Sequence, residues 1–554
     1  MKLPTVLVVL LGLMTMSHAG ITERPFRGCQ GDELDKYSGG MPSADGRWVA
    51  LSTYATNLAC DDHNQSADVF VLDRTSGFIE RVSVATDGTE ANDDSYLIGL
   101  SADARLVCFM SWADNLVAGD TNGVVDVFVH EVATGVTSRV NLSDHGDQAN
   151  DESYGSQMSA DGSFVVFYSY ATNLVPEDRN GVPDVFVRDL LAGTTTRESV
   201  DSSGAEGNGP SGDGLGAAIC AGGRYVAFYS QASNLVGDDT NGFGDVFIRD
   251  RLQQLTSRVS VSSSGEQANW DSWVPSISDD GSLVAFGSRA TNLIPDDTNN
   301  QVDVFVRNTL LGTTRRVNVS SSGAQANGSS FSHFLAGAGR YVAFSSYATN
   351  LVDDDHNGRE DVFIHDLLTE RTSLVSRTYD REQANEDCYA PRLSSDARIA
   401  SFVSEATNLV PDDALGIQDL FLRIEWSADR AQSTSYGDGW PGTLGVPLLT
   451  SEAPALCLSC PIDVGNSRGQ WTVALMFLGL DRADLPTAWD GHLLVAPLVA
   501  FPIAVPPAGA QLVPVLPCDR DLGGMAWYLQ VLIDDPGASR GVAFTPGLQL
   551  VLGD

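Results

Sequence analysis

Hydrophobic and polar residues alternate in short runs over residues 39–425, and the same order of runs returns seven times. In the copy that begins near Val274, a short apolar run and a tight turn precede the alternating segment Ser282 to Ser288. A long polar loop, the run Asp303 to Arg307, a second turn and the run Arg316 to Ser320 follow. Alternation with a period of two is typical of β-strands that bury one face. The pattern therefore predicts seven four-stranded antiparallel units without helices.

A turn signal of the form Ser-x-Asp-Gly-Arg, or a close variant, marks the period. It begins at Ser43, Ser101, Ser159, Cys220, Ser278, Ala336 and Ser394, with intervals of 58, 58, 61, 58, 58 and 58 residues. Units of this length cannot bury a core alone, so they indicate a propeller or a solenoid. We interpret residues 20–426 as an all-β, seven-bladed β-propeller with four-stranded blades.

Three details of the repeat lead to local expectations. Ala104 and Ala397 replace the turn glycine, and we expect another turn type there because alanine tolerates the left-handed conformation poorly. The longer third interval indicates a loop insertion between Gly204 and Gly216. The seventh copy stops after its third strand, whereas Thr22 to Arg27 lies about one period before the first copy's fourth strand. We expect this N-terminal segment to complete the last blade and remove an exposed sheet edge.

The regions outside the repeat predict further parts. Residues 1–19 are typical of a secretory signal peptide, with Lys2, a short apolar run and the sequence Ser-His-Ala before Gly20. Export to the periplasm, the cell surface or the medium follows. Residues 427–439 are expected to be a linker, and residues 440–554 a small β-sandwich of short strands. The apolar stretch Leu493 to Leu516 is interrupted by prolines, so we expect strands there and no membrane span.

The motif Ser-x-Asp-Gly-Arg-x-Val-Ala-Phe-x-Ser, followed by Asp-Val-Phe-Val-x-Asp, resembles the WD-like propeller repeats of the TolB type. The resemblance covers residues 39–425 and implies the propeller fold. The loop after the second strand is longer than in that family, and the α/β domain that precedes the TolB propeller is absent, so no Tol-system role is implied. Two C-terminal segments, Tyr436 to Gly442 and Asp535 to Leu550, resemble a terminal domain of varied secreted bacterial proteins.

Charge limits the partners. The chain carries 72 acidic and 33 basic residues, a formal net charge of −39. Nucleic acids and anionic membranes require clustered Lys and Arg, so neither is an expected partner. The acidity suits cations or basic surfaces, or simply maintains solubility. Among the eight cysteines, we expect Cys108 to be a buried thiol and Cys518 to form a disulfide with Cys457 or Cys460.

The loops between the second and third strands contain the motif Asp-x-Asn-x-x-x-Asp. Alternate Asp and Asn oxygens in a short loop are typical of calcium ligands. The same residues form Asx turns without metal, and both interpretations remain open. The candidate ligands are Asp62, Asn64, Asp68, Asp120, Asn122, Asp126, Asp178, Asn180, Asp184, Asp239, Asn241, Asp245, Asp297, Asn299, Asp303, Asp355, Asn357 and Asp361. In the seventh copy Leu415 replaces the Asn between Asp413 and Asp419.

Two positions beside these loops vary among the copies and are often aromatic. Aromatic side chains near a channel mouth stack on sugars, anchor proteins or merely cover the loops. The candidates after the second strand are Tyr54, Trp112, Tyr170, Arg289 and Tyr347, and those before the first strand are Tyr96, Tyr154, Trp273, Phe331 and Tyr389. Because antiparallel strands alternate in direction, both positions and the acidic loops are expected on one face.

No catalytic constellation is evident. Gly465 to Gly469 matches Gly-x-Ser-x-Gly, but strand-like segments flank it, so we interpret it as a hairpin turn. The histidines have no zinc-ligand spacing. The sequence favours a secreted, non-enzymatic binding or scaffold module for a protein or glycan, with calcium as a possible cofactor. The alternative is an extracellular polysaccharide hydrolase or lyase that acts at the channel mouth.

Overall fold

The computed structural model consists of two units, Ile21–Ile424 and a C-terminal unit after Ile424. The first is described at residues 21–378, 380–411 and 413–424. In the second, the structure describes residues 432–436, 440–441, 443–444, 446–451, 462–479, 481–487, 492–496, 499–512, 526–538 and 541–551. The expected signal peptide and the cysteines at 457, 460 and 518 lie outside these residues.

The first unit contains seven four-stranded antiparallel sheets, each built from consecutive strands except the last. The first sheet contains β2 (Ser38–Pro42), β3 (Trp48–Thr53), β4 (Asp68–Asp73) and β5 (Phe78–Arg81). The second contains β6 (Ser95–Leu100), β7 (Leu106–Ser111), β8 (Asp126–Glu131) and β9 (Val136–Arg139). The third contains β10 (Ser153–Met158), β11 (Phe164–Ser169), β12 (Asp184–Asp189) and β13 (Thr194–Arg197). The fourth contains β14 (Ala217–Ile219), β15 (Tyr225–Ser230), β16 (Asp245–Asp250) and β17 (Leu255–Arg258).

The remaining three sheets include the one that joins the ends of the ring. The fifth contains β18 (Ser272–Ile277), β19 (Leu283–Ser288), β20 (Asp303–Asn308) and β21 (Thr313–Arg316). The sixth contains β22 (Ser330–Leu335), β23 (Tyr341–Ser346), β24 (Asp361–Asp366) and β25 (Arg371–Leu374). The seventh contains β26 (Cys388–Leu393), β27 (Ile399–Ser404), β28 (Asp419–Ile424) and β1 (Ile21–Glu23).

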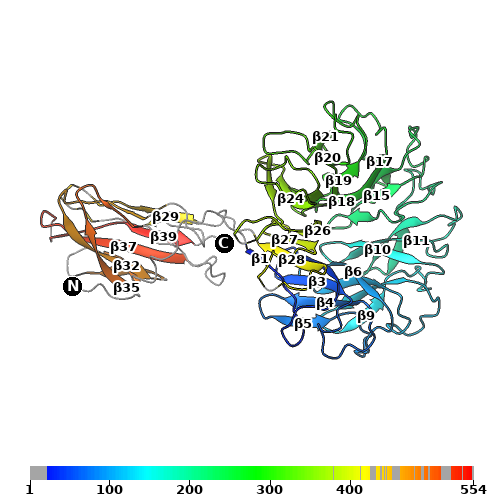
Figure 1. Cartoon of the computed structure of the whole chain (residues 1–554), viewed down its shortest axis with the longest axis horizontal. Coiled ribbons are helices and arrows are strands. Elements are labelled where there is room, and N and C mark those ends of the chain that lie inside the picture. Colours follow the sequence, from blue (N-terminus) through cyan, green and yellow to red (C-terminus); the bar gives the residue numbers. More distant parts are fainter. Residues whose placement is uncertain are drawn as a thin grey trace. The chain divides into compact units, whose positions relative to one another are not determined.

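These sheets form a β-propeller around a central channel, and Figure 1 shows them radiating from that axis. A cavity of about 250 Å³ is lined by residues of all seven first strands, among them Met41, Ile98, Gln157, Ala218 and Ser276. Only an arrangement in which every first strand faces the axis brings these residues to one cavity. The all-β propeller expected from the repeat is confirmed.

The N-terminal strand completes the seventh sheet, as the sequence predicted. β1 pairs with β28 in antiparallel register, with Ile21 opposite Ile424 and Glu23 opposite Leu422. Phe26, just beyond β1, is 1% exposed and packs in the core between the first and seventh sheets. A disulfide that the sequence did not predict, Cys29–Cys60, ties the same segment to the first sheet. In Figure 1 the blue β1 lies beside the yellow β28.

Alternation along the strands builds a core between neighbouring sheets. Six of the sheets contain a pair of stacked phenylalanines from their second and third strands, such as Phe109 and Phe128, with ring centroids 5.7 Å apart. Each hydrophobic cluster of the propeller draws residues from two neighbouring sheets, as where Val107 and Phe109 join Val69 and Val71. A blade therefore depends on its neighbour for burial, as expected of repeat architectures.

The turn expectation for the alanine copies was wrong. Ala104 and Ala397 have φ values of 53° and 55°, in the left-handed region that Gly46 and Gly162 occupy in their turns. The surrounding turn supplies the constraint. Ser101 Oγ donates to Asp103 Oδ1 at 2.7 Å, and the Arg105 amide donates to the same oxygen at 3.0 Å. The insertion between Gly204 and Gly216 lies in a loop, and the strand that follows it, β14, has only three residues.

The C-terminal unit is also built of strands. Its largest sheet has six strands: β29 (Gln432–Tyr436), β39 (Gly547–Val551), β37 (Ala526–Asp534), β32 (Thr472–Gly479), β35 (Val499–Val505) and β38 (Val542–Phe544). Smaller sheets contain β30 (Leu449–Ser451), β31 (Ile462–Val464), β36 (Ala510–Leu512) and β33 (Asp481–Pro486), β34 (His492–Ala496). One hydrophobic cluster joins Ile462 and Val464 of β31 to Met476 and Val531 of the large sheet.

Two expectations for this region differ from the structure. Gln432–Tyr436, placed in a linker by sequence, forms β29 and pairs with β39 along its full length. Residues 465–469 do not connect a hairpin, because β31 and β32 belong to different sheets. Ser467 within that segment is 3% exposed, and its Oγ donates to Asp535 Oδ2 at 3.0 Å. No strand-turn-helix surrounds it, so it is not a nucleophile elbow.

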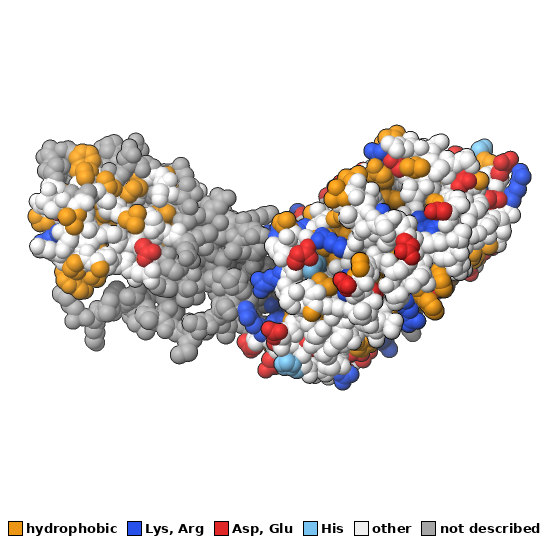
Figure 2. All heavy atoms as spheres, turned by 90° about the horizontal axis from the view of Figure 1, so that it is seen from above, with side chains coloured by type: hydrophobic (Ala, Val, Ile, Leu, Met, Phe, Trp, Pro, Cys, Tyr) orange, Lys and Arg blue, Asp and Glu red, His pale blue; other side chains and the backbone are white. Residues whose placement is uncertain are grey.

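Among the described residues, no helix is long and apolar enough to cross a membrane. Figure 2 shows Asp and Glu side chains scattered over the visible surface of the propeller, interspersed with Lys and Arg. The acidity of the chain is therefore not concentrated in one patch on that face.

Candidate functional site

The long loops of the propeller lie together on one face because the strands of each sheet alternate in direction. On this face the loop after each second strand is fastened to the loop that enters the same sheet. In the second sheet, Asn115 Nδ2 donates to the Glu90 carbonyl at 2.8 Å, and the Asn92 amide donates to Asn115 Oδ1 at 3.0 Å. The contact from the side-chain amide to a backbone carbonyl recurs at Asn173, Asn292, Asn350 and Asn408. The repeated Ala-Thr-Asn-Leu-Val segment thus has a structural role.

The Asp-x-Asn-x-x-x-Asp loops form Asx turns whose second carboxylate is buried. In the third repeat, the Val182 amide donates to Asn180 Oδ1 at 3.1 Å, and Asn180 Nδ2 donates to Asp184 Oδ2 at 2.8 Å. Asp184 is 0% exposed and accepts a further bond at Oδ1 from Ser199 Oγ at 2.5 Å. The motif therefore anchors the start of the third strand from within the sheet.

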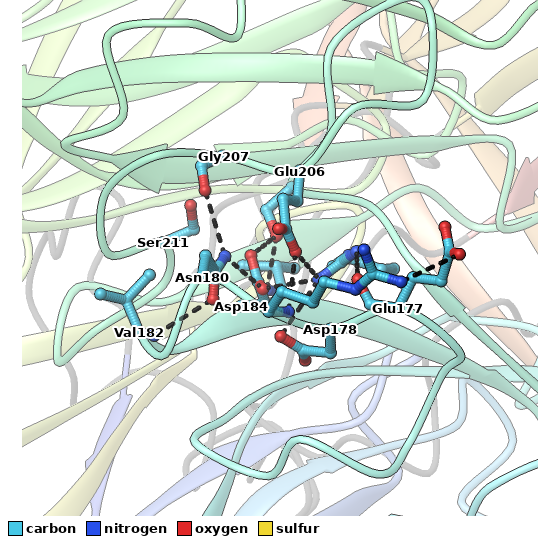
Figure 3. Close-up of polar contacts among 12 residues, drawn as sticks. Glu177, Asp178, Asn180, Val182, Asp184, Glu206, Gly207 and Ser211 are labelled. Atoms are coloured by element: carbon cyan, nitrogen blue, oxygen red, sulfur yellow. Dashed lines mark hydrogen bonds and ion pairs between the residues drawn. The ribbon is translucent and has the colours of Figure 1, made fainter.

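An arginine that the sequence reasoning missed lies between the carboxylates of most loops. Arg197 Nη1 lies 3.3 Å from Asp178 Oδ1, 3.1 Å from Asp184 Oδ2 and 2.9 Å from Glu206 Oε2. In Figure 3 the side chains of Asp178, Asp184 and Glu206 lie close together. The arginine ends the fourth strand of its sheet. Its signal was present, because arginine recurs at Arg81, Arg139, Arg197, Arg258 and Arg316 in register with the loops.

The same arrangement recurs around the ring with one exception. Arg139 pairs with Asp120 at 2.7 Å, and Arg258 and Arg316 lie within 3.6 Å of the corresponding aspartates. In the seventh sheet Arg24, just after β1, contacts Asp419 at 2.8 Å and Glu33 at 2.7 Å. In the sixth sheet Leu374 occupies this position.

Burial dominates the ionisation of these carboxylates. It raises the pKa of Asp68, Asp178 and Asp245 to about 6, although arginine opposes the shift. The pKa of Asp126, Asp184 and Asp303 is raised for the same reason. Three acidic groups could geometrically hold a metal ion, but in each an arginine already supplies a cation. The groups are Asp62, Asp68 and Glu90 around Arg81, Asp178, Asp184 and Glu206 around Arg197, and Glu33, Asp413 and Asp419 around Arg24.

Aromatic side chains from the first three sheets form a continuous row on the long-loop face. Tyr54 packs against Tyr96, Tyr96 against Trp112, and Trp112 against Tyr154, with ring centroids 5.9–6.4 Å apart. The Tyr54 and Tyr96 hydroxyls are hydrogen-bonded to each other, and the Tyr54 hydroxyl donates to Asp94 Oδ2 at 3.0 Å. Trp112 remains 39% exposed. The structure thus brings together four of the predicted residues from three different blades.

A second group surrounds a cavity of about 430 Å³ between the fourth and fifth sheets. Trp273 lines it, as do Tyr229, Phe243 and the carboxylates Asp239 and Asp271. Trp270 stacks on Phe243 with ring centroids 5.1 Å apart and is 46% exposed. Both carboxylates have partners: Asp239 lies 3.6 Å from Arg258, and Asp271 accepts the Gly244 amide at 2.8 Å. Two residues of this set were sequence candidates, Trp273 as a ligand-binding aromatic and Asp239 as a calcium ligand.

The other predicted residues are more dispersed. Phe331 packs against Tyr347 with centroids 6.4 Å apart, and both are partly exposed. The Tyr170 hydroxyl donates to Asp213 at 2.8 Å, and the Tyr389 hydroxyl donates to Gln418 at 2.7 Å. Burial and the nearby Glu152 raise the pKa of Tyr154 to about 12, so its hydroxyl is protonated and can donate a hydrogen bond at neutral pH. Arg289 is exposed beside its loop.

The remaining reactive residue types are structural. Cys108 is a buried free thiol, as expected, and Cys220 and Cys388 are buried too. His130 and His365 are buried and hydrogen-bond Thr137 and Thr372 through Nδ1. His333 is 5% exposed and lines the central cavity. The Thr137 and Thr372 hydroxyls donate to the carbonyls of Val84 and Val319, so each is held in a structural hydrogen bond.

Comparisons with known proteins give no family. No family model matches the chain, and no curated protein matches it. Among solved structures, it is similar to a putative TolB from Agrobacterium tumefaciens, with 17% identity, a TM-score of 0.31 and coverage of 54% of this chain and 89% of that chain. It is also similar to a GH74 xyloglucanase from Xanthomonas campestris, with 9% identity, a TM-score of 0.39 and coverage of 95% and 81%.

Proposed function

We propose that this protein is a non-enzymatic binding module that uses the long-loop face of its propeller to hold a glycan or protein ligand. The observation that carries the proposal is the aromatic row Tyr54–Tyr96–Trp112–Tyr154 together with the cavity beside Trp273. Rings fixed by edge contacts present broad apolar surfaces at low entropic cost, and neighbouring carboxylates accept hydrogen bonds. Both features suit a ligand rich in hydroxyl groups.

We further propose that the chain is exported through residues 1–19 and acts in the periplasm, at the cell surface or in the medium. The disulfide Cys29–Cys60 supports an oxidising compartment. The C-terminal unit, proposed to be a β-sandwich, serves as an accessory domain. Neither a nucleic acid nor an anionic membrane surface is a proposed partner, because the net charge is −39.

The test is a screen of the exported chain on a glycan array, combined with a pull-down from envelope extract. We expect a small set of related glycans, or one envelope protein, to be retained. Substitution of Trp112 by alanine should reduce retention, whereas substitution of Phe78, an exposed aromatic on β5 that is 57% exposed, should not. A chain that retains nothing in either screen contradicts the proposal.

A second candidate function is hydrolysis or elimination of an extracellular polysaccharide at the channel mouth. The observation that favours it is the position of Asp239 and Asp271 beside Trp273 in one cavity. Glycoside hydrolases use such carboxylate pairs, one of them with a raised pKa. Burial does raise the pKa of Asp239. However, the Arg258 and Gly244 contacts already occupy both carboxylates, which is why we rank binding first.

Product release distinguishes the two functions. The exported chain would be incubated with each polysaccharide that it binds, and reducing ends and unsaturated sugars would be measured. Turnover that is lost in Asp271→Asn would establish the enzyme. Binding without turnover establishes the module.

Calcium is the one cofactor that we propose. The arginines already supply a cation to the loops of the other repeats, so the proposal concerns the sixth repeat.

A further inference from the structure

The sixth repeat departs from its neighbours at one structural position. In the other six sheets an arginine at the end of the fourth strand, or just after it, reaches the buried aspartate that begins the third strand. These arginines are Arg24, Arg81, Arg139, Arg197, Arg258 and Arg316. The sixth sheet has Leu374 there, 4% exposed and packed in a hydrophobic cluster. Its aspartates, Asp355 and Asp361, are nevertheless retained and buried at 4% and 0% exposure.

The carboxylate left without an arginine has one oxygen without a hydrogen-bond partner. In the other six sheets the arginine contacts Oδ2 of the second aspartate, and in five of them Oδ1 accepts from a Ser or Asn. Asp361 follows the pattern at Oδ1, which accepts from Ser376 Oγ at 2.5 Å. Asn357 opposes the burial that raises the pKa of Asp361, but its side-chain amide does not reach Oδ2 within hydrogen-bond distance. Asp361 Oδ2 has no hydrogen-bond partner among the described residues. The orphan atom is thus the one that elsewhere faces a cation.

The loop of the sixth repeat places two carboxyl groups in a buried site. Asp355 Oδ1 accepts from Gln383 Nε2 at 3.0 Å, and burial raises the pKa of Asp355. Arg377, whose charge opposes the rise in the pKa of Asp361, pairs at 3.4 Å with Asp354, whose side chain is 63% exposed. His356 lies in the same turn, with its amide bonded to Gln383. Burial of two carboxylates without a counter-charge in direct contact is unfavourable, so a bound cation would stabilise this loop.

We propose that the loop of the sixth repeat binds one calcium ion between Asp355 and Asp361, at the position that an arginine guanidinium occupies in the other six repeats. Hard cations take oxygen ligands from short loops, and two carboxylates neutralise a divalent charge. Water completes the shell. The inference is independent of the aromatic face, so its failure would leave the proposed ligand-binding function unaffected.

The experiment is a calcium titration of the full chain after chelator treatment. Calorimetry with calcium chloride is expected to give one site, with a dissociation constant of about 10⁻⁴–10⁻³ M, as in extracellular modules. Saturation should raise the melting temperature by roughly 1–3 °C. Hydrogen exchange of peptides that cover residues 352–362 should slow, whereas the matching loops of the other repeats should not change.

Two variants at one position give a matched pair. Leu374→Arg supplies the guanidinium of the other repeats, so calcium binding should fall at least tenfold. Leu374→Met keeps the position apolar and should bind calcium as the parent does. If Leu374→Arg does not fold, Asp361→Asn replaces it, since the amide keeps an acceptor for Ser376 and removes the charge. Parent protein that is indifferent to 10 mM calcium, or variants that bind it unchanged, would overturn the proposal.

Discussion

At the scale of single residues, the strongest constraint on the propeller is how it compensates buried carboxylates. Arg139 is 5% exposed on its side chain and lies against Asp120 and Asp126, which are 3% and 0% exposed. Such contacts contribute little net stability when both partners are present, but the loss of one partner leaves a buried charge. The arginine at the end of most fourth strands therefore explains why the aspartates recur without requiring a metal.

Arg139→Leu should lower the free energy of unfolding by about 3–5 kcal/mol, because two buried carboxylates lose their counter-ion. Denaturant unfolding of the full chain measures this. Arg105→Leu is the control, since the Arg105–Glu131 pair is partly exposed and such surface pairs contribute at most about 1 kcal/mol. A similar loss in both variants would contradict the assigned role of burial.

His333 gives a pH-dependent prediction. Burial lowers its pKa to about 4, and the nearby Arg392 acts in the same direction. The unfolded chain therefore takes up a proton below about pH 6.5 before the folded chain does, and stability falls as the pH decreases from 6.5 to 4. His333→Gln should reduce this decline. Melting temperatures of both proteins between pH 4 and pH 7 test it, and parallel curves would refute it.

At the scale of elements, the pattern of alternating residues was sufficient to predict the strands, because each strand buries one face. The pattern was also sufficient to predict β1, because the seventh repeat lacks a fourth strand of its own and the N-terminal segment lies one period before the first such strand. The turns were harder. Ala104 has a φ of 53° because Ser101 and Asp103 hold the turn, and that hydrogen-bonded context overrides the preference of alanine.

Ala104→Gly should therefore stabilise the protein by about 0.5–1 kcal/mol. Relief of the left-handed strain, worth roughly 1–2 kcal/mol, exceeds the entropic cost of glycine in the unfolded chain. The free energy of unfolding of this variant is the measurement. Gly162→Ala provides the reverse case in the third repeat, where φ is 71°, and should destabilise. Equal stability in all three proteins would show that the turn carries no strain.

The candidate site was only partly predictable for a physical reason. Asp-x-Asn loops that bind calcium and those that form Asx turns contain the same residues, and the deciding partner lies on another strand. Likewise, Phe243 and Trp270 belong to a loop and become neighbours of Trp273 only through packing of two sheets. The aromatic row, in contrast, followed from counting positions, because the start of each first strand pairs with the end of the second.

At the scale of the whole molecule, closure of the ring depends on the N-terminal segment. β1 completes the seventh sheet, Arg24 compensates Asp419, and Phe26 is buried between the sheets. Deletion of residues 20–28 from the mature chain removes several core contacts at once. It should therefore lower the melting temperature of the propeller by roughly 10 °C or more. Calorimetry tests it, and an unchanged transition would contradict closure by β1.

The central claim is that the aromatic long-loop face binds the ligand. The most direct measurement is the dissociation constant of the best ligand from the glycan or envelope screen for the parent, Trp112→Ala and Trp273→Ala. Removal of an aromatic anchor should weaken binding at least tenfold, about 1.4 kcal/mol or more, with an unchanged melting temperature. Phe78→Ala should bind as the parent does. Unchanged dissociation constants in both tryptophan variants would contradict the account.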